Sequence, residues 1–371
     1  MSIASPAAFQ RYDPALAQPV PDEAALAAEL DEVLLSISSK TWEDEGQGLR
    51  AVHAKSHGLL SAVVEVPAGL SPELAQGLFA RPGRHPAVMR LSTTPGDLLA
   101  DRVSTPRGIA LRICDVPGPR LDGSDGPGAQ DVILVNGPQF NAPNGRAFLR
   151  SLKLLAKTTD RMDRTKTLIS AILRGTERGL EAMGGESVTL KAMGGEPPHH
   201  ILGETFFTQL PLRHGDHIAK LQLVPVSTSL RALTDVRLDL SDDDALREAV
   251  IAFFAAQGGE WELRAQLCTS LEEMPVDDAT ARWDEVRSPF RTVARVIAPP
   301  QPAWTPERSA AIDTGVGFSP WHGLEAHRPL GELMRLRRSA YAASQAFRAR
   351  KNGVALHPGC PFAAAARAAD R

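Results

Sequence analysis

The sequence predicts an α+β protein built on an antiparallel β-barrel or sandwich. Its strand-like segments are short, rich in β-branched and apolar residues, and separated by proline and glycine turns. Several of them alternate apolar and polar positions, as half-buried antiparallel strands do. About seven such segments follow one another without the regular helical crossovers that a parallel sheet requires.

Three parts are expected along the chain: an N-terminal arm and helix over residues 1–40, a barrel domain over 41–352 and a tail over 353–371. The arm has scattered prolines and little periodicity. Pro21-Asp22-Glu23 then opens an acidic helix, rich in alanine and leucine, that is expected to continue to about Ser39.

The hydrophobic pattern places the elements of the barrel domain. Strands are expected at 58–66, 87–92, 108–113, 131–135, 218–225, 261–267 and 290–297. Helices are expected from Phe148 to about Arg174, over 242–257, and from Leu330 to about Lys351. The sequence Ala-Met-Gly-Gly-Glu occurs at 182–186 and 192–196, which is too short a repeat to predict a solenoid.

Composition and charge predict a soluble, cytoplasmic protein without a nucleic-acid or membrane partner. The formal net charge is −3, and no stretch approaches the ~20 apolar residues that a membrane span needs. The N-terminus lacks the basic and apolar regions of a secretory signal. Cys114, Cys268 and Cys360 form no C-x-x-C pair, so we expect three ordinary thiols in a reducing compartment.

His53, within Arg50-Ala-Val-His53-Ala-Lys55, is the main candidate for acid–base chemistry. Taken alone, it also fits a solvated basic turn. As a general base it would suit peroxide cleavage, which requires a group that takes a proton from one oxygen and returns it to the other. Ser92 ends a predicted strand. If it lies behind His53, its hydroxyl can hydrogen-bond one ring nitrogen and fix the tautomer.

Tyr341 is one of two tyrosines, and Arg337 precedes it by one helical turn on the same face. A neighbouring guanidinium favours the ionised phenol, and a bound ferric ion would favour the phenolate further. Tyrosine is an unusual axial ligand of haem iron. The alternative is a tyrosine that packs on the core beside an arginine.

Five arginines lie in or next to apolar segments, where an unpaired charge would be costly. Haem carries two propionates, and arginine is suited to bidentate pairing with carboxylates. Intramolecular ion pairs or surface exposure are the alternative, above all for Arg107. The five are Arg50, Arg90, Arg107, Arg337 and Arg348.

Other candidates are less specific. Phe148 fits either a helix core or a ring lying against a porphyrin. His322 and His327 are expected in a packed turn, and the His199-His200 pair in an exposed loop rather than at a metal site. The chain has no phosphate-binding loop, dinucleotide fingerprint, nucleophile elbow or H-E-x-x-H motif.

Taken in order, these segments resemble the catalase superfamily over residues 45–350. Residues 50–55 are similar to the family's distal-histidine strand, and 89–93 to its second distal segment. Asp101 with 105–112 resembles the Asp…Pro-Arg-Gly-Phe-Ala segment, and 131–138 the distal asparagine loop. Arg337-x-x-x-Tyr341, with Arg348 seven residues later, resembles the proximal helix.

The resemblance implies a haem b enzyme with an antiparallel barrel, surrounding helices and a C-terminal proximal helix. It would make His53 the distal acid–base group, Ser92 its hydrogen-bond partner and Tyr341 the iron ligand, supported by Arg337. The distal asparagine would be Asn136. Further haem contacts would come from Arg50, Val52, Arg90, Phe148 and Arg348, with the three arginines on the propionates.

The loop around Asn136 departs from the family pattern, which places an asparagine three residues before the proline. Counting back from Pro138, that position is Val135. Either Asn136 takes the distal role after a small backbone shift, or that hydrogen bond is missing and catalase action is weakened. The chain is also short for a typical catalase, so the resemblance implies a compact catalase-related peroxidase.

The expected activity is therefore that of a haem-dependent peroxidase or catalase acting on hydrogen peroxide or organic hydroperoxides. Its partners would be the peroxide and a small-molecule electron donor, and a homo-oligomer is expected. Two alternatives stay open. One is rearrangement of fatty-acid hydroperoxides, as in allene oxide synthase. The other is a non-enzymatic haem-binding protein, which would need Tyr341 and the arginines but no oriented His53–Ser92 pair.

Overall fold

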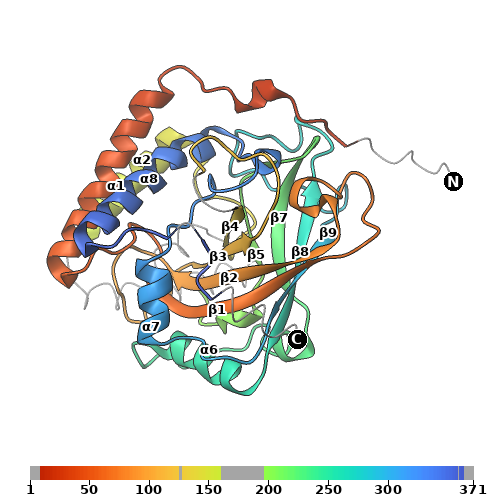
Figure 1. The fold of residues 1–371 in the computed structure, drawn as a ribbon. Coiled ribbons are helices and arrows are strands. Elements are labelled where there is room, and N and C mark those ends of the chain that lie inside the picture. Colours follow the sequence, from red (N-terminus) through yellow and green to blue (C-terminus); the bar gives the residue numbers. More distant parts are fainter. Residues whose placement is uncertain (1–8, 125–127, 160–195, 358, 363–371) are drawn as a thin grey trace, which may run out of the picture.

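The antiparallel strands of the chain close into a barrel (Figure 1). The computed structural model describes residues 9–124, 128–159, 196–357 and 359–362. Its strands are β1 (Lys55–Val66), β2 (Gly83–Thr93), β3 (Arg107–Cys114), β4 (Ala129–Val135), β5 (Phe206–Phe207), β6 (Leu212–His214), β7 (His217–Pro225), β8 (Gly259–Leu267) and β9 (Arg291–Ala298). They pair in the order β5-β4-β3-β2-β1-β9-β8-β7-β6, and β7 also pairs with β5, which closes the ring and leaves β6 beside β7. The prediction of an antiparallel barrel is confirmed.

Alternation of side chains along the strands separates the barrel core from an outward face. Leu60, Met89 and Leu111 are direct neighbours across β1, β2 and β3, and all belong to the main apolar cluster. The residues next to them in sequence point the other way, because successive side chains of a strand lie on opposite sides of the sheet. Arg90 and Ala110, which are paired across β2 and β3, therefore lie on the outward face.

Three long helices lie side by side at one side of the barrel in Figure 1: α1 (Glu23–Glu45), α2 (Gly145–Thr159) and α8 (Glu332–Asn352). They share a leucine-rich cluster that includes Leu30, Leu152 and Leu336. The helix α8 ends at Gly353, whose φ of 64° is the left-handed conformation that glycine adopts readily. Basic side chains in its last turn also favour the helix dipole.

The remaining helical elements are shorter. The helix α6 (Ala245–Ala256) packs on β1. None of the described helices is long and apolar enough to cross a membrane. The others are η1 (Pro14–Ala17), η2 (Gly77–Ala80), η3 (Ile201–Gly203), α5 (Thr228–Arg231), α7 (Pro306–Arg308), η4 (Ser309–Thr314) and η5 (Glu325–His327).

All seven predicted strands are confirmed, with ends that differ by a few residues. The strands β5 and β6 were not predicted, because two or three residues are too few for a recognisable alternation. The helix α1 continues beyond Ser39 to Glu45, where Gly46 stops it. The helix predicted from Phe148 begins at Gly145, and its stretch 160–174 lies outside the described residues, as does the repeat at 182–186.

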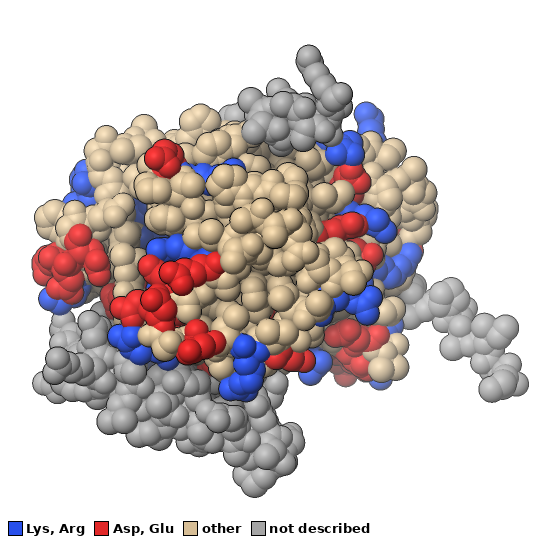
Figure 2. All heavy atoms as spheres, turned by 90° about the horizontal axis from the view of Figure 1, so that it is seen from below, with Lys and Arg blue, Asp and Glu red and all other residues tan. Residues whose placement is uncertain are grey.

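The surface that Figure 2 draws carries charges of both signs, and two of the three cysteines are paired. Figure 2 shows basic and acidic side chains interspersed on the face that it presents, around a largely uncharged centre. The expectation of three free thiols was wrong, because Cys114 and Cys360 form a disulfide and Cys268 is the free, buried cysteine. A separation of 246 residues gives no local signal of such a pairing.

Candidate functional site

His53 lies in the loop between α1 and β1, with its imidazole against the outward face of β3. Its φ of 58° is a left-handed conformation, which costs a non-glycine residue about 1–2 kcal/mol and is held by surrounding contacts. A β-carbon at Gly108 would lie 2.7 Å from Cε1 of His53, so the ring sits where a side chain would otherwise be. On the neighbouring strand β2, Ser92 Oγ lies 3.4 Å from His53 Nδ1. The structure thus brings the predicted pair together.

The environment of His53 keeps its imidazole neutral. Burial, followed by the positive charges of Arg90 and Arg337, lowers the pKa of His53 to about 3. A neutral ring can accept a proton, which a general base must do. The last helix does pack on this loop, because Ala51 belongs to the same apolar cluster as Leu336 and Ala340 of α8.

Tyr341 and Arg337 are one helical turn apart on α8, as predicted. Arg337 Nη2 donates a hydrogen bond to the Tyr341 hydroxyl at 2.8 Å, and its guanidinium lies 5.3 Å from the centre of the ring. Ala340, next to Tyr341, packs in one apolar cluster with Ala51 of the loop that carries His53. The loop before β1 and the last helix therefore meet at one site.

Three arginines gather around Asp313 and are called the arginine cluster below: Arg90 and Arg348, which are buried, and Arg50, which is half-buried. Arg90 Nε donates to Asp313 Oδ1 at 2.6 Å. Burial and then the neighbouring Arg348 and Arg90 lower the pKa of Arg50 well below its usual value. The same causes, burial first and then Arg90, lower the pKa of Arg348 to about 10. Asp313 is the carboxylate that interacts with all three arginines among the described residues, and it was not predicted from the sequence.

The backbone of residues 309–317 holds two members of the arginine cluster in place. This segment starts with the single π-helical turn η4. Arg50 Nη2 donates to the carbonyl of Val316 at 2.9 Å, and Arg348 Nη2 donates to the same oxygen at 3.2 Å. Both guanidinium groups also donate to the carbonyl of Asp313. The 309–317 segment is therefore the shared support of the cluster, which no local motif in the sequence indicates.

The net charge of the arginine cluster and Asp313 suits a ligand with two carboxylates. Three guanidinium groups and the Asp313 carboxylate leave two positive charges in excess. Arg50 Nε is buried and has no hydrogen-bond partner among the described residues. Buried cations that repel one another are stabilised when further anions bind them. Elsewhere, no group of three or more His, Cys, Asp or Glu side chains in the described residues could hold a metal ion.

Val135, and not Asn136, lies on the face of the sheet that carries His53. Ser92, Gly108 and Val135 are directly paired across β2, β3 and β4, so their side chains share one face. Asn136 is held elsewhere: its Oδ1 accepts from the backbone N–H of Arg107 at 2.9 Å. The small backbone shift that would bring Asn136 to His53 is not present in this structure.

The amide of Asn136 belongs to a buried polar cluster at the end of the barrel. Its Nδ2 donates to Glu196 at 2.8 Å and to Glu204 at 2.9 Å. Arg107, which is fully buried, lies 3.0 Å from Glu204 and donates to the carbonyl of Pro197. Of the two alternatives for Arg107, the intramolecular ion pair is therefore the one observed.

Val52 and Phe148, the two apolar residues predicted to contact the cofactor, differ in their surroundings. Val52, next to His53, is 40% exposed, which is unusual for a valine. Phe148 on α2 is partly buried, packs edge-on against Phe140 at 5.1 Å and adjoins the cluster that contains Met334 of α8. No contact between Phe148 and His53 is seen among the described residues.

The remaining histidines are placed by other interactions. His322 lies 3.4 Å from Asp131, and His327 is buried against Phe79. His200 caps η3 through Leu202, and it is buried rather than exposed as predicted. The expectation of packed positions for His322 and His327 agrees with this.

The comparisons with known proteins give a fold and no closer relative. No protein-family model and no curated protein matches the sequence. Among solved structures, a fungal catalase matches with a TM-score of 0.60 and 17% identity, over 97% of this chain and 69% of that one. Catalase A from Saccharomyces cerevisiae matches with a TM-score of 0.60 and 17% identity, over 97% and 71%.

A bacterial catalase matches with a TM-score of 0.57 and 16% identity, over 93% of this chain and 64% of that one. The chain thus spans about two thirds of the length of these catalases. The match extends over nearly all of the present chain and includes the closed antiparallel barrel with its surrounding helices. The chain therefore has a catalase-like fold.

Proposed function

We propose that the protein is a haem-dependent peroxidase that reduces hydrogen peroxide or organic hydroperoxides with a small-molecule electron donor. Two pairs carry this proposal: His53 with Ser92, and Tyr341 with Arg337. The loop and the helix that bear them pack together through Ala51 and Ala340, and both send an arginine to the carbonyl of Val316. The catalase-like fold supports it, because the matched structures are catalases. The excess positive charge of the arginine cluster supports a ligand that carries two carboxylates.

The residues present fit haem b. Tyr341 would be the protein ligand of the iron, and Arg337 would stabilise its phenolate through the hydrogen bond already formed. The arginine cluster would bind the two propionates, and Val52 and Phe148 would contact the ring. The haem would supply the iron at which peroxide is reduced.

His53 would move the proton in this reaction. Its neutral ring would take the proton from the O–H oxygen of the hydroperoxide and return it to the other oxygen, which leaves as water or an alcohol. Ser92 Oγ, at 3.4 Å from Nδ1, would fix the tautomer in which Nε2 is free to accept that proton. Gly108 leaves room for the ring to lie against the strand.

Val135 favours peroxidase action over catalase action. An isopropyl group on the face of His53 cannot donate a hydrogen bond, so it does not help to orient a second hydrogen peroxide. It does offer an apolar surface to the organic part of a hydroperoxide. We therefore propose that organic donors reduce the enzyme faster than hydrogen peroxide does.

The absorption spectrum of the purified protein after titration with haem tests the proposal. We expect one haem per chain and a high-spin ferric Soret band that resists reduction by dithionite. Oxidation of an organic donor by cumene hydroperoxide should then exceed oxygen release from hydrogen peroxide. A chain that takes up no haem would contradict the whole proposal, and oxygen release at the rate of a catalase would contradict the ranking of the two activities.

The same apolar Val135 also favours a second candidate, which is rearrangement of lipid hydroperoxides at the same pocket. That reaction uses no electron donor. Product analysis with a fatty-acid hydroperoxide separates the two activities: an alcohol supports peroxidase action, and an epoxide or its hydrolysis products support rearrangement.

A further inference from the structure

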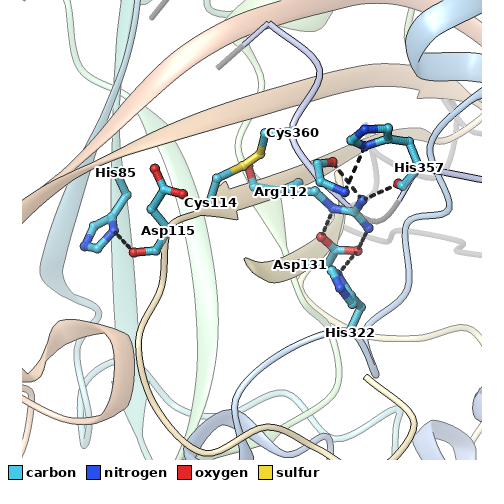
Figure 3. Close-up of a disulfide and its surroundings, with 9 residues drawn as sticks. His85, Arg112, Cys114, Asp115, Asp131, His322, His357 and Cys360 are labelled. Carbon is cyan, nitrogen blue, oxygen red and sulfur yellow. Dashed lines mark hydrogen bonds and ion pairs between the residues drawn. A yellow bond between two sulfur atoms is a disulfide. The ribbon is translucent and has the colours of Figure 1, made fainter. Parts of the chain in front are cut away.

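A disulfide between Cys114 and Cys360 fastens the C-terminal tail to the barrel wall (Figure 3). Cys114 is the last residue of β3 and is buried, whereas Cys360 is only partly buried. The bond joins positions 246 residues apart, and no step of the proposed reaction uses it.

The disulfide lies on the same face of β3 as the candidate site. Because side chains alternate along a strand, Gly108, Ala110, Arg112 and Cys114 form one row on the outward face. Gly108 lies under His53 at one end of this row, and Cys114 is at the other end. Six residues of strand span about 20 Å. Any influence of the disulfide on the site must therefore pass through the contacts between them.

One such path is the docking of the tail on the 309–317 segment. Val316 and His357 form a parallel β-bridge, and the N–H of His357 donates to the carbonyl of Gly315. Cys360 and Phe362 pack on the apolar cluster that contains Val316. The tail thus holds the same residue whose carbonyl receives hydrogen bonds from Arg50 and Arg348.

Arg112 forms a second path to the same segment. Its guanidinium makes a bidentate pair with Asp131, with both N–O distances 2.7 Å, and Figure 3 shows this pair beside the disulfide. Nη2 also donates to the carbonyl of Gly317 at 2.7 Å, and Nη1 reaches the carbonyls of His357 and Gly359 at 3.4 Å. One buried guanidinium therefore ties the tail to the end of the 309–317 segment.

We propose that Cys114 and Cys360 are a second peroxide-sensitive site, whose disulfide holds the 309–317 segment against the arginine cluster. The inference rests on the proposed function for the identity of the oxidant and of the ligand retained. Reduction would release Cys360, and with it the contacts of Phe362 and His357 that fix Val316. The arginine cluster would then lose part of its support, and haem would dissociate faster.

The oxidation balances with one peroxide. The thiolate of the less buried Cys360 attacks a peroxide oxygen, the O–O bond breaks, and a sulfenic acid forms while water or an alcohol leaves. The thiol of Cys114 then attacks the sulfenic sulfur, the S–S bond forms, and a molecule of water leaves. Two thiols lose two electrons and two protons, and these reduce one peroxide to water plus water or an alcohol.

Alkylation and mass spectrometry of the full chain test the redox step. After treatment with glutathione, we expect both cysteines to be labelled, and after one equivalent of hydrogen peroxide we expect the label to be lost. Cys268→Ser should behave like the unaltered chain, because Cys268 is buried and outside the pair. A disulfide that glutathione leaves intact would overturn the proposal, since the bond would then be permanent.

Hydrogen exchange of the haem-free protein tests the structural step without any need for activity. Amides of 309–317 should exchange roughly tenfold faster in Cys360→Ser than in Cys268→Ser, which corresponds to about 1.4 kcal/mol. Transfer of haem to apomyoglobin should be faster by a similar factor. If exchange of 309–317 is the same in both variants, the proposal fails even when haem is bound. If exchange differs but no haem binds, the proposed function fails and the structural coupling stands.

Discussion

Arg337 Nη2 donates a 2.8 Å hydrogen bond to the Tyr341 hydroxyl, one turn further along α8. A hydrogen bond to a charged group contributes about 1.5–3 kcal/mol, and in the proposed haem complex it would favour Tyr341 as the iron ligand. Arg337→Gln should therefore shift the Soret band and increase the rate of haem loss about tenfold. Arg338→Gln is the matched control, because Arg338 donates to the carbonyl of Asp122 and stacks on Trp321 instead. Equal spectra and equal haem loss in the two variants would refute the role of Arg337.

Replacement of His53 by alanine should lower peroxide turnover at least about 100-fold, because general acid–base catalysis contributes that much or more. Haem binding should persist, since Tyr341 and the arginine cluster do not depend on the imidazole. Steady-state oxidation of an organic donor and the haem content of the purified variant measure the two effects. Full turnover in His53→Ala would leave a non-enzymatic role for any bound haem.

Gly108→Ala should displace the imidazole without removing it. The added carbon would lie 2.7 Å from His53 Cε1, so the ring must move away from Gly108, which disturbs its 3.4 Å contact with Ser92. A displacement of about 1 Å in a catalytic group can lower turnover by about 100-fold. Gly137→Ala is the control, because a β-carbon there meets its nearest neighbour at an ordinary 3.6 Å. The proposed orientation of His53 would be wrong if both variants kept full activity.

Val135→Asn should restore a hydrogen-bond donor on the face of His53. Release of oxygen from hydrogen peroxide is expected to rise at least about tenfold, while donor oxidation by organic hydroperoxides should fall. An oxygen electrode and a donor assay on the same preparation give the ratio of the two activities. Val135→Ala removes bulk without adding a donor, so a rise in oxygen release in that variant would indicate access rather than hydrogen bonding.

The buried histidines predict that the haem-free protein loses stability in acid. Burial lowers the pKa of His327 to about 3 and that of His214 to about 4, from an ordinary value of 6.5. Their rings lie 5.7 Å apart, and the charge of Arg213 acts on His327 as well. Below pH 6.5 the unfolded chain binds protons that the folded chain excludes, so stability falls as the pH drops toward 4. Each such histidine contributes up to about 1.4 kcal/mol per pH unit.

Urea unfolding at pH 7 and at pH 5 measures this effect. The free energy of unfolding should be lower at pH 5, and the difference should shrink in His327→Gln. The same free energy at both pH values would contradict the assignment of neutral, buried rings.

The strands, and the contact between Arg337 and Tyr341 on one helix, could be predicted because their signals are local. Alternation gave the seven longer strands, and the spacing of Arg337 and Tyr341 placed both on one helical face. The meeting of His53 with α8 is not a local property, and it was inferred from a family resemblance. Asp313 and Gly108 were not predicted, because their roles depend on which segments the fold brings to them.

Residues 135 and 136 show why spacing in the sequence does not determine which side chain faces His53. A polar side chain one position away from the expected one invites the idea of a backbone shift. In a strand, a shift of one residue turns the side chain to the other face. Here two hydrogen bonds oppose such a shift: the N–H of Asn136 donates to the carbonyl of Arg107, and the N–H of Arg107 donates to Asn136 Oδ1. The hydrogen-bond register therefore outweighs the chemical preference of one side chain.

Arg50 and Arg348 donate to the same carbonyl oxygen, that of Val316, although they come from opposite ends of the chain. During translation the last barrel strand, which ends at Ala298, leaves the ribosome before α8 does, and domains fold largely as they emerge. The two hydrogen bonds to the Val316 carbonyl cannot both form until α8, which carries Arg348, has been synthesised. We therefore expect cofactor loading to be a late event of biosynthesis, so that nascent chains that stop before α8 can build the barrel yet cannot retain a haem.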